Sequence, residues 1–127
     1  MKALLVVAAF AVGAAGAAQA ATPAAVRNEI TALLARLESS GCRFNRNGDW
    51  HGGAEAKGHL LRKLDAIDGK AAVTSTERFI ELAASRSSSS GREYQVQCGS
   101  AAPQPSAAWL AAQLRVLRST ASPDTAR

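Results

Sequence analysis

The stretch CRFNRNGD, residues 42–49, and the stretch REYQVQC, residues 92–98, decide the fold of this chain. In each of them apolar and polar residues alternate, which is typical of a strand with one buried face. We therefore predict strands over residues 42–46 and 92–98. The dipeptide Asn47-Gly48 directly after the first strand is a strong turn signal. A two-stranded ribbon is not stable alone, so helices must pack on its apolar face.

The chain holds two cysteines, and each lies in one of these strands. We pair the strands antiparallel, with Cys42 opposite Cys98. In this register Phe44 falls opposite Val96, and both apolar residues share a face with the cysteines. A parallel pairing would set Phe44 against Ser100, which is less favourable. Because two lone cysteines usually pair in an oxidising compartment, we predict a disulfide that requires the same register as the apolar pattern.

Apolar residues at helical spacing predict four helices around the two strands. They cover about residues 23–40, 53–67 and 105–118, with a further helix from Thr74 to the polar run 86–90. The chain is therefore predicted to be a small single α+β domain of order α-β-α-α-β-α. Its two-stranded antiparallel ribbon packs on the helices.

Polar residues mark the expected starts of these helices. Thr22 is the expected N-cap of the first helix, and Thr74 with Glu77 has the spacing of a capping box for the third. Asp49 is a candidate cap for the second helix. In the third helix Leu82 is expected to face the core.

Residues 1–20 have the pattern of a cleavable signal peptide. Lys2 gives a positive start, residues 3–18 are uncharged, and residues 18–20 (AQA) place small side chains where a signal peptidase reads them. Cleavage would leave Ala21 as the new N-terminus. A transmembrane anchor is the alternative, but the run is shorter than the roughly 20 residues that span a bilayer. We predict a periplasmic or secreted protein with no membrane anchor after cleavage.

The remaining chain is long enough for one domain, which we place at residues 21–118, followed by a flexible tail over 119–127. Removal of Lys2 lowers the formal net charge from +5 to +4. The basic residues are scattered and lack the clustered face that a nucleic-acid site needs. The sequence therefore predicts no nucleic-acid partner.

A series of separated motifs runs through residues 42–98. They are residues 42–49, His51, Glu55-Ala56, His59-Leu60, Lys63, residues 76–80 (TERFI), residues 87–91 (SSSSG) and Tyr94. In order and spacing this series resembles the YfeK-like family of small exported bacterial proteins. The resemblance implies an exported domain of unassigned function, with no known activity, cofactor or catalytic residue. The chain departs from the family at Glu93, where proline is common, and in the Ala/Pro-rich segment after Cys98.

A polar row with a spacing of four residues borders the apolar face of the second helix. Its members are His51, Glu55, His59 and Lys63. Two histidines and a carboxylate can bind a divalent metal, and a Glu–His pair can act in acid–base catalysis. The alternative is a structural polar flank, because the zinc-protease spacing is absent. His51 also stands before Gly52-Gly53, so a helix start after it is open. We predict no metal site.

The turn after the first strand holds a second group of candidates. Arg46, which the predicted register places opposite Tyr94, is a candidate for binding an anion or a carboxylate. Asn47 and Asp49 tolerate the left-handed backbone that a turn requires and also suit a ligand-binding turn. The serine run 87–90 resembles a phosphate-binding loop only in composition, because it is expected to follow a helix end, where the dipole disfavours anions.

The sequence therefore predicts an uncharacterised exported domain that binds a protein or small-molecule partner, without a cofactor and without a recognisable catalytic constellation. The candidate binding residues are Arg46, Asn47, Asp49, His51, Glu55 and His59. The alternative is a small hydrolase or metal-dependent enzyme that uses His51, Glu55 and His59. Whether those three side chains converge in a pocket distinguishes the two hypotheses.

Overall fold

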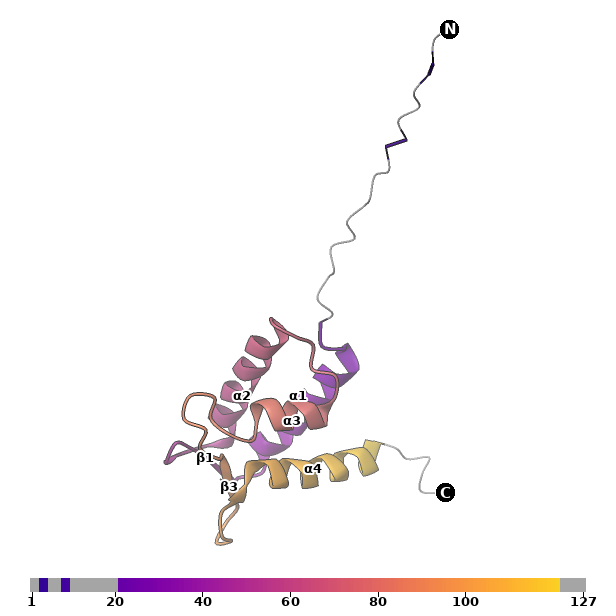
Figure 1. Cartoon of the computed structure of the whole chain (residues 1–127). Helices are drawn as coiled ribbons and strands as arrows, with labels where there is room; N and C mark the ends of the chain where they lie inside the picture. Colours follow the sequence, from indigo (N-terminus) through magenta and orange to yellow (C-terminus); the bar gives the residue numbers. More distant parts are fainter. Residues whose placement is uncertain (1–2, 5–7, 10–20, 122–127) are drawn as a thin grey trace.

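The computed structural model describes residues 3–4, 8–9 and 21–121 of the 127-residue chain. The predicted signal peptide, apart from residues 3–4 and 8–9, and residues 122–127 of the predicted tail lie outside this part. The elements are, in chain order, α1 (Ala24–Ser39), β1 (Arg43–Arg46), β2 (Asp49–His51), α2 (Gly53–Asp68), α3 (Thr76–Ala83), β3 (Gln95–Gln97), β4 (Gln104–Pro105) and α4 (Ser106–Ala121). The short strands gather at one end of the helical layer (Figure 1).

The sheet has the order β2-β1-β3-β4, and its neighbouring strands are antiparallel. In the central pair Phe44 lies opposite Val96, so the predicted register is confirmed. The α+β class is confirmed as well, although the sheet has two short strands, β2 and β4, beyond the predicted ribbon. These strands are only three and two residues long, too short for a visible alternation.

The hydrophobic core lies between the four helices and the inner face of the sheet. Its largest fully buried side chains are Tyr94, Phe44, Phe79, Ile30, Leu33, Leu34, Leu37, Leu60, Leu64, Leu110, Val73 and Val96. Phe44 and Tyr94 pack ring against ring, with centroids 5.0 Å apart. The helical members recur every three or four positions, which gives each helix one apolar face.

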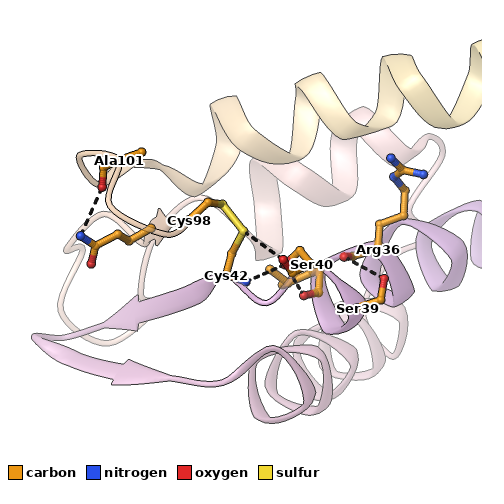
Figure 2. The surroundings of a disulfide bond; sticks show 8 residues. Arg36, Ser39, Ser40, Cys42, Cys98 and Ala101 are labelled. Atoms are coloured by element: carbon orange, nitrogen blue, oxygen red, sulfur yellow. Dashed lines mark hydrogen bonds between the residues drawn. A yellow bond between two sulfur atoms is a disulfide. The ribbon is translucent and has the colours of Figure 1, made fainter.

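Cys42 and Cys98 form a disulfide, as predicted, with their Cα atoms 4.3 Å apart. The bond lies where α1 leads into β1 and where β3 leads out toward α4 (Figure 2). The backbone N–H of Cys42 donates to Oγ of Ser40 over 3.0 Å, and the Ser40 hydroxyl donates to the Leu37 carbonyl. The end of α1 is thus tied to the cross-linked strands.

The start of α1 differs from the prediction. Thr22 is not the N-cap, because Pro23 holds that position and makes no side-chain capping bond. The Thr22 backbone N–H and hydroxyl instead both donate to the Asp68 carboxylate, and Thr22 Oγ1 accepts the N–H of Val73 over 2.9 Å. A tertiary network at the end of α2 therefore takes the hydroxyl that the local pattern assigned to capping.

The third helix is shorter than predicted. Its N-cap is Ser75 and not Thr74, and Ser75 Oγ accepts the N–H of Arg78 over 3.0 Å. The helix ends at Ala83, and Leu82, which was expected to face the core, is 41% exposed. The following residues leave the helix because they form a hairpin-like loop over 85–94.

The 85–94 loop is closed by backbone hydrogen bonds between its two sides. The Tyr94 N–H donates to the Ser85 carbonyl, and the Ser87 N–H donates to the Arg92 carbonyl. Gly91, with a φ of 73°, supplies the left-handed residue that the tight return needs. The serine run thus lies in a loop of its own and does not follow a helix end directly.

The start of α2 corrects one expectation and decides between two alternatives for His51. Asp49 does not cap this helix, because it begins β2, and the N-cap is Gly52. His51 lies in β2, so the polar row on the helix begins at Glu55. Among the described residues, no helix combines the length and the apolar character that crossing a membrane requires.

Candidate functional site

A pocket of about 310 Å³ opens between the β1–β2 turn, α2 and the 85–94 loop. It is lined by Arg46, Asn47, His59, Lys63, Ser87, Ser88, Ser89 and Tyr94. We call it the Arg46–Lys63 pocket after its two cationic side chains. Its lining contains no carboxylate.

Three elements bring the polar side chains of the pocket together. Arg46 is the last residue of β1, and its neighbour Asn45 lies opposite Gln95, the residue after Tyr94. His59 and Lys63 lie one turn apart on α2 and therefore project from the same side of that helix. Because Leu60 and Leu64 bury the neighbouring face of α2 in the core, His59 and Lys63 lie at the border of the core and reach the strand pair.

The serine loop is held against the β1–β2 turn by Asn47. Asn47 has a φ of 54° and Gly48 a φ of 91°, the left-handed pair that a two-residue hairpin turn requires. The Asn47 amide donates to Oγ of Ser87 over 3.4 Å and accepts the Ser90 hydroxyl at 2.5 Å. Asn47 therefore has both of the roles that the sequence allowed: it is a turn residue and it lines the pocket.

The inner wall of the pocket is a chain of hydrogen bonds. Nη1 of Arg46 lies 2.8 Å from Nδ1 of His59, and Nε2 of His59 lies 3.1 Å from the Tyr94 hydroxyl. Nζ of Lys63 donates to the Tyr94 hydroxyl over 3.0 Å and to the Arg86 carbonyl over 2.9 Å. The same ammonium lies 4.7 Å from the centroid of the Tyr94 ring, within the range of a cation–π contact.

The surroundings set the protonation of these groups. Burial, followed by the positive charges of Arg46 and Lys63, lowers the pKa of His59 to about 4. Burial raises the pKa of the Tyr94 phenol, an effect that Arg46 partly opposes. Burial and then Arg46 lower the pKa of the Lys63 ammonium. At neutral pH the imidazole is therefore uncharged and the phenol is protonated.

The two cations of the pocket have no acidic partner in the described part of the chain. None of the ion pairs there involves Arg46 or Lys63. Both side chains are half-buried, and each uses part of its donor set on a neutral group. The guanidinium has five N–H donors and the ammonium three, so both keep donors for a ligand.

A second, smaller hollow lies beside the pocket. It has a volume of about 30 Å³ and is lined by Phe44, Arg46, His51, Glu55, Ala56, His59 and Arg62. Nδ1 of His51 lies 3.2 Å from the Glu55 carboxylate, and Nε2 of His51 is buried without a hydrogen-bond partner in the described part of the chain. The hollow has room for about one water molecule.

The predicted histidine–carboxylate row is thus partly brought together. His51, Glu55 and His59 line the same hollow, but Nδ1 of His59 faces the guanidinium of Arg46. A metal cation at this nitrogen would meet that positive charge. Over residues 21–121 no group of three or more His, Cys, Asp or Glu side chains is placed to hold a metal ion.

Three of the six predicted binding residues, Arg46, Asn47 and His59, line the Arg46–Lys63 pocket. Asp49 is exposed on β2 and lines neither cavity. The pocket residues that the sequence did not assign to binding are Lys63, Tyr94 and Ser87 to Ser89. The predicted register already set Tyr94 opposite Arg46, and this was the sequence signal that could have assigned Tyr94 to the pocket.

The fold and the pocket define a small disulfide-linked α+β domain with a cationic cavity beside the β1–β2 turn. The family model described as "Family of unknown function (DUF5329)" matches residues 24–118, so the chain belongs to this family. The matched segment spans all eight elements from α1 into α4. No curated protein and no solved structure matches the chain.

Proposed function

We propose that this protein is exported and that its mature domain binds a small anionic ligand in the Arg46–Lys63 pocket. The observation that carries the proposal is the pairing of two half-buried cations with several hydroxyl groups in a lining without carboxylates. Half-buried charges are costly when nothing compensates them. A bound anion would supply the missing counter-charge.

Several features of the pocket support a small ligand. Its volume of about 310 Å³ lies at the lower end of the range typical of small-molecule sites. Its walls come from a strand end, a helix and a loop that Asn47 fixes to the hairpin. Such a site is largely formed before binding, which reduces the entropy cost of holding a ligand.

Export is supported by two independent features. The first 20 residues have the signal-peptide pattern, and the disulfide belongs to an oxidising compartment. We also propose the finer family name suggested by the motif series, the YfeK-like family, for this exported protein.

Export predicts one processed product. The protein recovered from the periplasmic fraction should have the mass of a chain that begins at Ala21, within one or two residues, and that has lost two hydrogens to the disulfide. Intact-mass spectrometry under non-reducing conditions measures both. Recovery of the full-length chain from the membrane fraction would refute cleavage.

Anion binding in the pocket predicts that two variants lose affinity for sulfate. Calorimetric titration of the mature protein with inorganic sulfate should show saturable binding. Arg46→Gln and Lys63→Gln should each weaken it about tenfold or more, because a hydrogen bond to a charged group contributes about 1.5–3 kcal/mol.

The matched control for these variants is Arg115→Gln. It removes one positive charge from α4, on a groove between α3 and α4 that is separate from the pocket. Its sulfate affinity should stay close to wild type. If the three variants lose affinity equally, the binding is a general charge effect and the pocket is not the site.

A further inference from the structure

The two cations of the inner wall can only donate hydrogen bonds. Nη1 of Arg46 lies 2.8 Å from Nδ1 and 3.5 Å from Nε2 of His59, so it approaches both ring nitrogens and fixes no tautomer. Nε2 of His59 and the Tyr94 hydroxyl are hydrogen-bonded over 3.1 Å, and the tautomer decides which of them donates.

Lys63 holds the other side of the Tyr94 hydroxyl. Its ammonium donates to the Tyr94 oxygen over 3.0 Å and to the Arg86 carbonyl over 2.9 Å. An ammonium has three N–H donors, so one of them is left for a ligand in the pocket that Lys63 lines. Tyr94, which is 1% exposed, thus positions Lys63 and His59 at the inner wall.

The serine loop also presents a donor to the pocket. Oγ of Ser87 accepts from the Asn47 amide and from the Ser90 N–H. Its proton therefore goes to Oγ of Ser89, 3.1 Å away, and leaves the Ser89 proton free at the pocket wall. Donors thus face the pocket from the inner wall and from the loop.

From this arrangement we infer that the Arg46–Lys63 pocket takes the dianionic phosphoryl group of a small phosphomonoester. The inference rests on the proposed anion-binding function and names the ligand class. Arg46 and Lys63 face the pocket with groups that can only donate. A dianionic phosphoryl oxygen can only accept, whereas a protonated P–OH would face donors and leave its own hydrogen unpaired.

The size of the pocket favours an ester over the bare ion. A volume of about 310 Å³ corresponds to about ten water molecules at about 30 Å³ each. An orthophosphate ion has only five non-hydrogen atoms and would fill only part of that space. A short polyol attached to the phosphoryl group would occupy the rest and reach the exposed hydroxyls of Ser88 and Ser89.

The test compares three probes on the wild-type protein by calorimetry: glycerol phosphate, inorganic phosphate and inorganic sulfate. Glycerol phosphate should bind more tightly than inorganic phosphate at pH 8. Its affinity should fall about tenfold between pH 8 and pH 5, because a phosphomonoester has its second pKa near 6 and becomes a monoanion. Sulfate stays a dianion throughout, so its affinity should change little.

Sulfate also controls for titration of the protein itself. His51, Glu55 and Arg62 line the neighbouring hollow and act on either anion, so a pH-dependent change of the protein itself would also change the sulfate affinity. Two results together would overturn the phosphoryl inference and leave anion binding intact. Sulfate affinity would be lost in Lys63→Gln, and the affinity for glycerol phosphate would not change between pH 8 and pH 5. Absence of binding by all three probes would refute both. Tighter binding of inorganic phosphate than of its ester would overturn the ester.

Discussion

Replacing Cys42 or Cys98 with serine should lower the free energy of unfolding of the domain by about 2–5 kcal/mol, the usual cost of losing a native disulfide from a small domain. The bond joins residues 56 positions apart, so it closes a long loop in the unfolded chain. On the chain-entropy estimate such a loop is worth about 4 kcal/mol. A domain of this size has a total stability of only about 5–15 kcal/mol, so the variants should be far easier to unfold.

Urea denaturation followed by circular dichroism measures this effect. Cys42→Ser, Cys98→Ser and the double variant should share one midpoint, because either single change already removes the cross-link. Wild-type protein in excess reductant should move to that same midpoint, whereas the reductant should leave the double variant unchanged. Two free thiols in the unreduced, denatured wild-type protein would contradict the disulfide.

The strand register could be predicted because two independent constraints agree on it. Alternation has a period of two, so a slip by one residue would turn Phe44 and Val96 out of the core. A disulfide allows only a narrow range of Cα separations, and so it selects the same pairing. The helices could also be predicted, since the apolar residues at helical spacing in α1, α2 and α4 lie in the core or pack against it.

What could not be predicted depended on tertiary contacts. Thr22 has a good local reason to cap α1, but Asp68 and Val73 compete for its hydroxyl. The segment after Ala83 continues a plausible helical pattern, but its backbone bonds across to Arg92 and Tyr94. In each case a partner distant in sequence offers a better-satisfied hydrogen bond than the local one.

The same reasoning explains the partial success at the pocket. Arg46, Asn47 and His59 were recognised because turn chemistry and helical spacing are local signals. The serine run was judged by the dipole of a helix expected to precede it directly, and this premise was wrong because α3 ends at Ala83. Lys63 was treated as a member of a polar row, and only the position of Tyr94 shows that it belongs to the pocket wall.

The Gly53→Ala variant should lower the free energy of unfolding of the domain by about 1–3 kcal/mol, the usual cost of overpacking. We expect a value near the upper limit of this range. A Cβ atom at Gly53 would lie 2.6 Å from the Leu37 carbonyl oxygen and 2.8 Å from the Glu38 Cα atom. Both neighbours are backbone atoms in the last turn of α1, so no side-chain rotation can relieve the contact. The first turn of α2 therefore approaches α1 in a way that only glycine permits.

Gly58→Ala is the matched control in the same helix. A Cβ atom there meets only the flexible end of the Arg62 side chain, at 3.5 Å. Because glycine is a poor helix former, this variant should be more stable than wild type by up to about 1 kcal/mol. If the two glycine-to-alanine substitutions change the stability in opposite directions, the loss at position 53 comes from the contact with α1 and not from helix propensity.

The Gly53 contact also bears on the pocket, because α2 carries His59 and Lys63 whereas Arg46 lies on β1. A shift of the first turn of α2 away from α1 would change the spacing along the Arg46–His59–Tyr94 chain of hydrogen bonds. We therefore expect Gly53→Ala to weaken sulfate binding even where the protein is fully folded, whereas Gly58→Ala should retain it. Thermal unfolding and the same calorimetric titration measure both quantities. Equal stability of the two variants would show that α1 and α2 can separate at no cost, contrary to the close contact at Gly53.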